Sequence, residues 1–190
     1  MSEIFYKYRS FRNFEHLVDI LVNSRIYTAN YAAMNDPMEG CYKYPDSYDK
    51  QEIAKLEKKI IQTKFCSLSK FSNIDLMWAH YANGNRGICI GVEIKKNSNF
   101  DELLEVNYNG QLNIAEELKP NNSQPKEILR HKNLCWEYEA EVRVFPKEGR
   151  LIDVNVKELI FGKRVDRQLA PLVKELMSKF QPKAKISNQI

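Results

Sequence analysis

The sequence predicts an α+β domain with a mixed, mostly antiparallel sheet or pair of sheets and flanking helices. The chain has 190 residues, which suits one domain over residues 1–190. Hydrophobic residues make up 43% and charged residues 28%, as in ordinary globular proteins. Strand-like and helix-like segments also follow one another without the regular alternation that builds a parallel sheet.

The expected strands are short runs of β-branched and aromatic residues with a two-residue alternation. The clearest is 86–94, in which Ile88, Ile90, Val92 and Ile94 share one face. The other expected strands are 5–9, 26–28, 65–69, 103–108, 139–145, 150–154, 159–161 and 183–187.

The expected helices have apolar residues at helical spacing, as Ile53, Leu56 and Ile60 do in 49–64. The other expected helices are 14–23, 74–82, 123–132 and 166–180. The composition of 34–40 requires a turn, and 109–122 is polar and irregular.

Composition and motifs argue against several classes of protein. No run reaches the roughly 20 apolar residues that span a bilayer. The first residues do not resemble a signal peptide, so we expect a cytoplasmic protein without membrane association. The four cysteines form no Cys-x-x-Cys pair and the three histidines have no metal-ligand spacing, which predicts no bound metal. A nucleotide held by a Gly-x-Gly-x-x-Gly or Walker-type loop is not expected either.

Residues 136–143 (Trp-Glu-Tyr-Glu-Ala-Glu-Val-Arg) hold the densest polar cluster. On a strand, Glu139, Glu141 and Arg143 would project from one face. This face is either a solvated, self-neutralising edge or a site where carboxylates meet a cationic or hydroxylated ligand. Trp136 favours the second interpretation, because an aromatic wall suits sugar or base rings.

Two further blocks allow a structural and a functional interpretation. The predicted helix carrying Trp78, His80 and Tyr81 is either a core helix or one that turns a His or Tyr into a pocket. Ser67 and Ser69 share one strand face, where hydroxyls either complete hydrogen bonds at the strand end or contact a ligand.

The remaining block is the turn that contains Asn35, Asp36 and Glu39. An Asx-type turn before Pro37 explains it structurally. Glu39 is then free to cap a helix or to pair with Arg9, at the end of the first strand.

In their order, these blocks resemble the family known as domain of unknown function 2971. The pattern is Tyr-Lys-Tyr-Arg, Asn-Asp-Pro-x-Glu, Phe-x-Ser-x-Ser, Met-Trp-x-His-Tyr-Ala, Gly-Ile-x-Ile and Trp-x-Tyr-Glu-x-Glu-x-Arg. The resemblance covers residues 4–162, and the family name conveys no activity.

A second resemblance is to ADP-ribosyltransferases with an Arg, Ser-x-Ser, Glu-x-Glu signature. Arg9, Ser67-Leu-Ser69 and Glu139-Ala-Glu141 occur in that order, although the family has Ser-Thr-Ser and a shorter second gap. The resemblance implies a fold of that kind, with NAD as the substrate. It also implies transfer of ADP-ribose to a protein or nucleic acid, as in a toxin or phage-defence protein.

The same resemblance implies residue roles. Glu141 would stabilise an oxocarbenium-like transition state, Glu139 would orient the acceptor, and Arg9 would bind the diphosphate. Glu141→Gln is then expected to abolish activity and leave the fold intact. A hydroxyl of Ser67 or Ser69 would hydrogen-bond within this network, and His80 would contact the ribose or the diphosphate. Tyr81, Trp78 or Tyr31 would stack on the nicotinamide ring.

Two other classes stay open. The polar cluster could belong to a non-catalytic module that binds a nucleotide or other ligand. It could also be a metal-dependent nuclease, whose metal would be held by Asp36, Glu39, Glu139 and Glu141. Convergence of Arg9, Ser67 and Glu141 around one open cleft would favour the enzyme. A wide separation of these residues, or a Glu141 sealed by Arg143, would favour the binding module.

Overall fold

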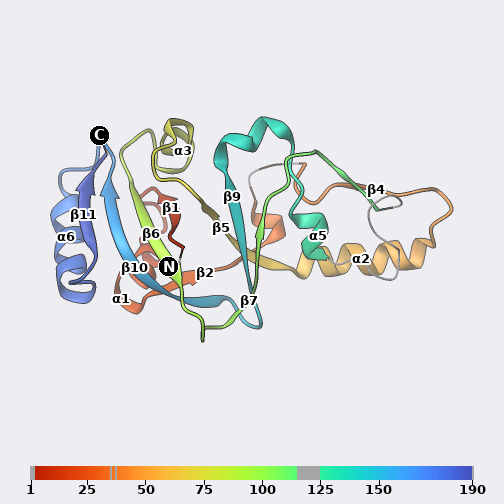
Figure 1. Cartoon of the computed structure of the whole chain (residues 1–190), viewed down its shortest axis with the longest axis horizontal. Helices are drawn as coiled ribbons and strands as arrows, with labels where there is room; N and C mark the ends of the chain where they lie inside the picture. Colours follow the sequence, from red (N-terminus) through yellow and green to blue (C-terminus); the bar gives the residue numbers. More distant parts are fainter. Residues whose placement is uncertain (1–2, 35, 37, 115–124, 190) are drawn as a thin grey trace.

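The main sheet brings distant segments of the chain side by side (Figure 1). The computed structural model describes residues 3–34, 36, 38–114 and 125–189. In order across the sheet, the strands are β11 (Lys185–Asn188), β10 (Leu151–Phe161), β6 (Ile88–Ile94), β1 (Phe5–Arg9), β5 (Lys64–Ser69), β9 (Glu141–Pro146) and β7 (Phe100–Glu105). Along this path all pairs are antiparallel except β10–β11. The predicted α+β class with a mostly antiparallel sheet is confirmed.

Short elements complete the sheet and its connections. Strand β2 (Arg25–Tyr27) pairs with β10, and β3 (Ala29–Asn30) pairs with β5. Strands β4 (Tyr42–Lys43) and β8 (Leu112–Asn113) form a separate parallel pair. Two 3₁₀ helices are η1 (Tyr31–Ala33) and η3 (Leu134–Glu139).

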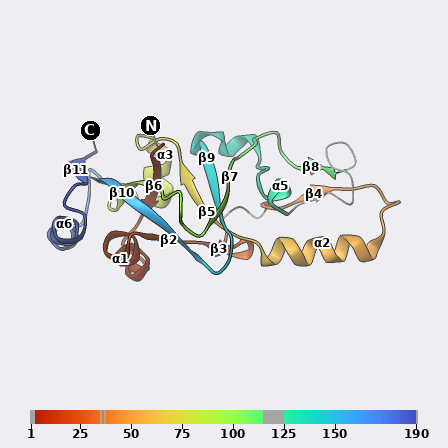
Figure 2. The same ribbon diagram turned by 60° about the horizontal axis from the view of Figure 1, so that its bottom comes forward.

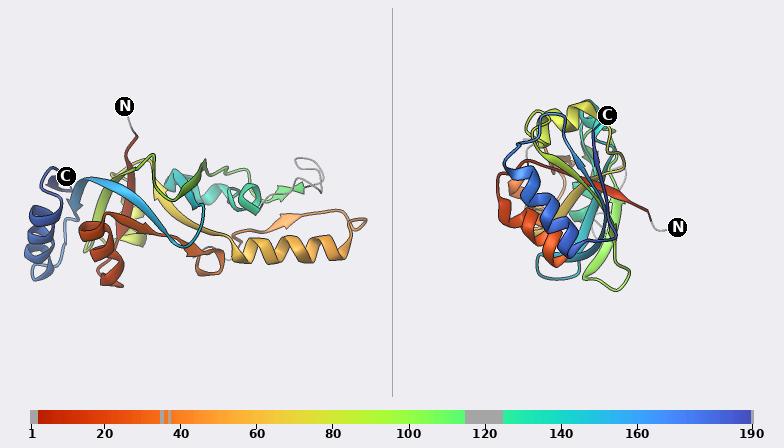
Figure 3. Two further views of the ribbon diagram at one scale, coloured as in Figure 1. Left: turned by 90° about the horizontal axis from the view of Figure 1, so that it is seen from below. Right: turned by 90° about the vertical axis from the view of Figure 1, so that its left-hand side faces the viewer.

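Helices cover β1 from both sides, because Phe5 on one face and Tyr8 on the other are buried. Helices α1 (Phe14–Asn23) and α6 (Leu169–Phe180) lie side by side (Figure 3). Both contribute to the largest core cluster, which includes Phe5. On the opposite face, Tyr8 meets Trp78 of α3 (Asp75–Tyr81) edge to face at 5.3 Å. Arg9 is therefore held at the end of a strand that is fixed on both faces.

Helices α2 (Lys50–Gln62) and α5 (Pro125–Leu129) extend away from this sheet together with β4 and β8 (Figure 2). A second core cluster holds them together, with Ile60 of α2 and Ile128 of α5 among its buried members. The Asp49 side chain caps α2 by accepting the Gln51 N–H at 2.9 Å. Another strand, β10, was expected as two segments, but it is continuous with a bulge between Val156 and Glu158.

Candidate functional site

A cavity of about 570 Å³ lies where β1, β5 and the start of β9 run side by side. Residues of α1, the 34–39 turn, α3 and η3 complete its walls. Its charged lining residues are Lys7, Arg9, Arg12, Asp36, Glu39, Lys132, Glu139 and Glu141. Residues that are far apart in sequence thus meet in space, including all five in the Arg, Ser-x-Ser and Glu-x-Glu motifs.

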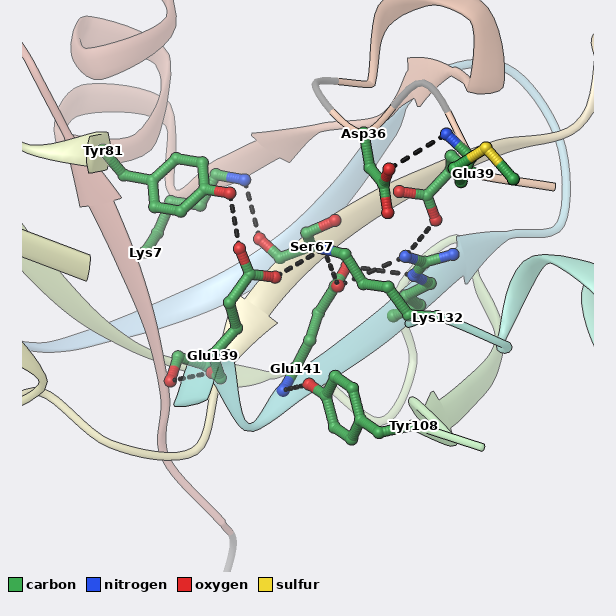
Figure 4. A network of polar contacts seen from close by, with 12 residues as sticks. Lys7, Asp36, Glu39, Ser67, Tyr81, Tyr108, Lys132, Glu139 and Glu141 are labelled. Carbon is green, nitrogen blue, oxygen red and sulfur yellow. Dashed lines mark hydrogen bonds and ion pairs between the residues drawn. The ribbon is translucent and has the colours of Figure 1, made fainter. Parts of the chain in front are cut away.

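A buried ion network forms part of the cavity wall (Figure 4). Arg143 donates from Nε and Nη2 to the two carboxylate oxygens of Glu141, at 2.9 and 3.2 Å, and its Nη2 also pairs with Glu39. The Nζ atom of Lys132 bridges Glu139 at 2.5 Å and Glu141 at 3.1 Å. The Arg143 side chain is fully buried, and the other four are nearly so. Three carboxylates therefore share two cations away from water.

Local backbone geometry explains how this network is assembled. Glu141 and Arg143 are two residues apart on β9, so they share a face, as predicted. The prediction is wrong for Glu139, which ends the 3₁₀ helix η3 instead of lying on the strand. Ala140 between them has φ of 43°, which breaks the strand alternation. Glu139 joins the network only through Lys132.

The two glutamates have opposite electrostatic environments. Burial alone would raise the pKa of Glu141, but Arg143 and Lys132, with a hydrogen bond from Ser67, outweigh it and lower the pKa to about 2. Burial raises the pKa of Glu139, and Lys132 and Tyr81 offset this only in part. Glu141 is consequently ionised at neutral pH, whereas Glu139 binds a proton more readily than an ordinary glutamate.

Arg9 contributes a cation to the cavity wall. Its guanidinium is largely desolvated, which lowers its pKa. Among the residues that the structure describes, no carboxylate forms an ion pair with it. The expected pairing of Arg9 with Glu39 is wrong, because Glu39 pairs with Arg143. An unpaired, desolvated cation in a cavity wall is a ready partner for an anionic group of a ligand.

The two serines of the Ser-x-Ser motif have different surroundings. The Ser67 hydroxyl is half-buried, lines the cavity and hydrogen-bonds Glu141. The Ser69 hydroxyl is fully buried; it donates to the Glu139 carbonyl at 2.7 Å and accepts the Phe71 N–H at 3.2 Å. Ser67 therefore stabilises the Glu141 carboxylate, while Ser69 holds the backbone at Glu139 and Phe71.

Aromatic residues from α3 and η3 line one side of the cavity. They are His80 and Tyr81, at the end of α3, and Trp136. The Tyr81 hydroxyl donates to Glu139 Oε1 at 2.5 Å, and the Nζ of Lys132 lies 4.8 Å from the Trp136 ring centroid. Tyr81 and Trp136 therefore present ring surfaces beside charged groups.

Two of the aromatic residues expected to stack on a ligand lie elsewhere. Trp78 is fully buried, and its indole N–H donates to the Ser72 carbonyl at 2.9 Å. Tyr31 donates to the Glu39 carbonyl at 2.7 Å and lines a separate cavity beside α2. Neither reaches the main cavity. Asn35, another predicted site residue, lies outside the described residues.

Three residues of the site were not predicted from the sequence as site residues, although Lys7 belongs to the Tyr-Lys-Tyr-Arg block. Lys132 follows α5 and carries no motif, although it bridges two glutamates. Lys7 donates to the Ser67 carbonyl at 2.7 Å, and the Tyr108 hydroxyl accepts the Glu141 N–H at 2.7 Å. Only an excess of buried acids over the bases near them could have indicated that a further cation, here Lys132, pairs with Glu139 and Glu141.

The comparisons with known proteins give one result. The model of the family described as "Protein of unknown function (DUF2971)" matches residues 77–144, which confirms the first of the two resemblances for that part of the 4–162 range. The matched part runs from α3 to β9 and contains Tyr81, Lys132, Glu139 and Glu141. Neither the curated proteins nor the solved structures provide a match. Within the described residues, no helix is both long enough and apolar enough to cross a bilayer.

Proposed function

We propose that the cavity binds NAD and supports transfer of ADP-ribose to an acceptor. The family model that matches residues 77–144 states no activity, so this proposal is made from the cavity. The observation that carries the proposal is the convergence of Arg9, Ser67 and Glu141 on one cavity. They lie on β1, β5 and β9, which are consecutive neighbours in the sheet. These are the three motif positions of the ADP-ribosyltransferase signature, in the same order.

The cationic part of the cavity suits the diphosphate of NAD. Arg9 is desolvated and unpaired among the described residues, and Arg12 and His16 of the adjoining α1 segment line the same cavity. A guanidinium presents parallel N–H groups that match two phosphate oxygens. Binding of an anion there would supply the charge that Arg9 lacks.

The acidic part suits the sugar at which the bond is broken. In the proposed reaction, the bond between ribose C1′ and the nicotinamide nitrogen breaks, and the electron pair leaves with nicotinamide. Positive charge then develops on the ribose, and the ionised Glu141 stabilises it without moving. Arg143 and Lys132 fix the position of this carboxylate before the reaction begins.

Glu139 suits the second half of the reaction. An acceptor nucleophile forms the new bond to C1′ and loses a proton. Glu139 has a raised pKa and is held by Tyr81 and Lys132 at the cavity wall, so it is a suitable acceptor for that proton. The acceptor is a protein or a nucleic acid in this proposal.

The two other classes fit the site less well. The pairing of Arg143 with both oxygens of Glu141 is the arrangement expected for a binding module without activity, and such a module also accounts for Arg9. It gives no reason, however, for two glutamates with opposite pKa shifts in one wall. A metal-dependent nuclease needs carboxylates with free oxygens for a metal. Glu39, Glu139 and Glu141 already pair with Arg143 or Lys132.

The proposal is tested by titrating NAD into the wild type and into Arg9→Ala in a calorimeter. Loss of the guanidinium should weaken binding roughly tenfold or more, the usual effect of losing a charge-assisted hydrogen bond. The thermal midpoint should stay the same or rise, since an unpaired desolvated cation costs stability. Arg167→Ala, at an exposed position, is the matched control and should change neither quantity.

Activity is measured as release of nicotinamide and as transfer of labelled ADP-ribose to lysate protein or nucleic acid. Binding of NAD with neither release nor transfer would favour the non-catalytic module. Absence of NAD binding at millimolar concentration would refute the proposal.

A further inference from the structure

Asp36 is a buried carboxylate with one oxygen unused. Its side chain lines the main cavity, and the residue is only 8% exposed. Oδ1 accepts the N–H of Met38 at 2.9 Å, as in an Asx turn. Oδ2 is buried and has no hydrogen-bond partner among the described residues. Because a buried acceptor without a donor costs stability, this oxygen is well placed to receive a donor from a ligand.

The other acids of the cavity differ from Asp36 in this respect. Glu39 and Glu141 pair with Arg143, and Glu139 pairs with Lys132 (Figure 4). Arg9, the desolvated guanidinium of the cavity wall, forms no ion pair with Asp36 or with another described carboxylate. The cavity wall therefore holds an Asp36 oxygen without a donor and an Arg9 guanidinium without an ion pair among the described residues. A ligand that carries both a phosphate and hydrogen-bond donors can satisfy both.

We propose that Asp36 is a specificity-determining residue whose Oδ2 accepts a hydrogen bond from the 2-hydroxyl of the ligand's ribose. This inference rests on the proposed function, in which the ligand is NAD. A carboxylate offers only acceptors, so it repels phosphate and requires a donor. Ribose hydroxyls are the donors nearest to a phosphate in any nucleotide, and a carboxylate on the ribose 2-hydroxyl is a recurrent solution in nucleotide sites.

The test compares D-ribose 5-phosphate with 2-deoxy-D-ribose 5-phosphate, which differ only in that hydroxyl. Their dissociation constants, and that of NAD, are measured by calorimetry for the wild type, Asp36→Asn and Asp49→Asn. Asn at position 36 keeps the Oδ1 that accepts the Met38 N–H, so the turn is preserved. Asp49 makes the same local bond, to Gln51 N–H, at an exposed site away from the cavity and is the matched control.

The wild type should prefer the ribose compound by about tenfold or more, as expected for a hydrogen bond to a charged group. Asp36→Asn should reduce this preference to about twofold or less, and Asp49→Asn should retain it. Equal binding of the two sugars by the wild type would overturn the inference even if Asp36→Asn did not fold. So would a preference that Asp36→Asn leaves unchanged.

The outcomes separate this inference from the proposed function. If NAD binds but the preference does not depend on Asp36, the inference fails and the proposed function stands. If the sugar phosphates show an Asp36-dependent preference and NAD does not bind, the proposed function fails and the ribose contact stands. If none of the three compounds binds, both fail.

Discussion

Replacing Glu141 with Gln should destabilise the protein substantially at neutral pH. The substitution keeps the size of the side chain and removes the negative charge that lies between Arg143 and Lys132. These cations are 0% and 7% exposed, so water cannot replace the lost charge. We therefore expect Glu141→Gln to cost stability as well as activity.

The loss of free energy of unfolding in Glu141→Gln follows from the pKa of Glu141 and from the usual cost of breaking a buried ion pair. A fall in the pKa of Glu141 from its ordinary 4.5 to about 2 corresponds to about 3 kcal/mol of stability at neutral pH. Removing one partner of a buried ion pair costs about 3–5 kcal/mol. The lower end applies, because Arg143 keeps Glu39 and Lys132 keeps Glu139. For a chain of this length, about 3 kcal/mol lowers the thermal midpoint by about 6–12 °C.

The pH dependence supplies a second readout. Since the folded-state pKa of Glu141 is lowered, its contribution is fully present above pH 4.5 and is lost as the pH falls toward about 2. The difference between wild type and Glu141→Gln should therefore shrink across that window. Urea unfolding or calorimetry at pH 7 and pH 3 measures it, with reversibility checked at each pH.

Glu105→Gln provides the control. Glu105 pairs with Lys70 at 2.6 Å, but its side chain is 64% exposed, so its loss should cost no more than about 1 kcal/mol. Equal losses for the two variants at pH 7 would refute the assignment of Glu141 to a buried network. A difference that does not change between pH 7 and pH 3 would refute its lowered pKa.

Three smaller predictions concern the neighbouring strands. Ser69→Ala should lower the free energy of unfolding by about 1–3 kcal/mol in urea titrations, because it leaves a buried carbonyl without a donor. Ser67→Ala should cost under about 1 kcal/mol, since its hydroxyl is half-buried, yet slow nicotinamide release; equal stability losses at both serines would contradict their separate roles. Gly87→Ala should cost about 1–3 kcal/mol, measured in the same way, because a Cβ would collide with the Arg9 carbonyl oxygen and force β1 and β6 apart; a neutral effect would contradict this packing.

Local patterns in the sequence were enough to predict most of the fold. The alternation in 86–94 and the helical spacing in 49–64 correspond to β6 and α2 within a few residues. Prediction was poorest where tertiary contacts decide the backbone. The 139–145 segment alternates like a strand from its first residue, but Ala140 adopts a left-handed conformation and the strand begins at Glu141. No local pattern indicates this, because only Gly and Asn commonly signal such a turn.

The sequence predicted which motifs contribute residues to the site, but it did not predict the ion pairs between those residues. The order of Arg9, Ser67 and Glu141 pointed to one cavity, and the structure places all three in its wall. The sequence could not indicate that Lys132 would meet Glu141, because that contact depends on how the segment after α5 folds over β9. It also could not separate Trp78 from Tyr81, because both lie on the short helix α3, and only the packing of β1 shows that Trp78 is buried.

The shared lysine explains how two neighbouring glutamates acquire different properties. Lys132 contacts both carboxylates, but Arg143 contacts only Glu141. Because of this second cation, ion pairing outweighs burial at Glu141 and lowers its pKa, whereas burial outweighs ion pairing at Glu139 and raises its pKa. One carboxylate is therefore fixed as an anion and the other is left able to exchange a proton. A pair of acids whose environments separate their pKa values in this way is what acid–base chemistry on a single substrate requires.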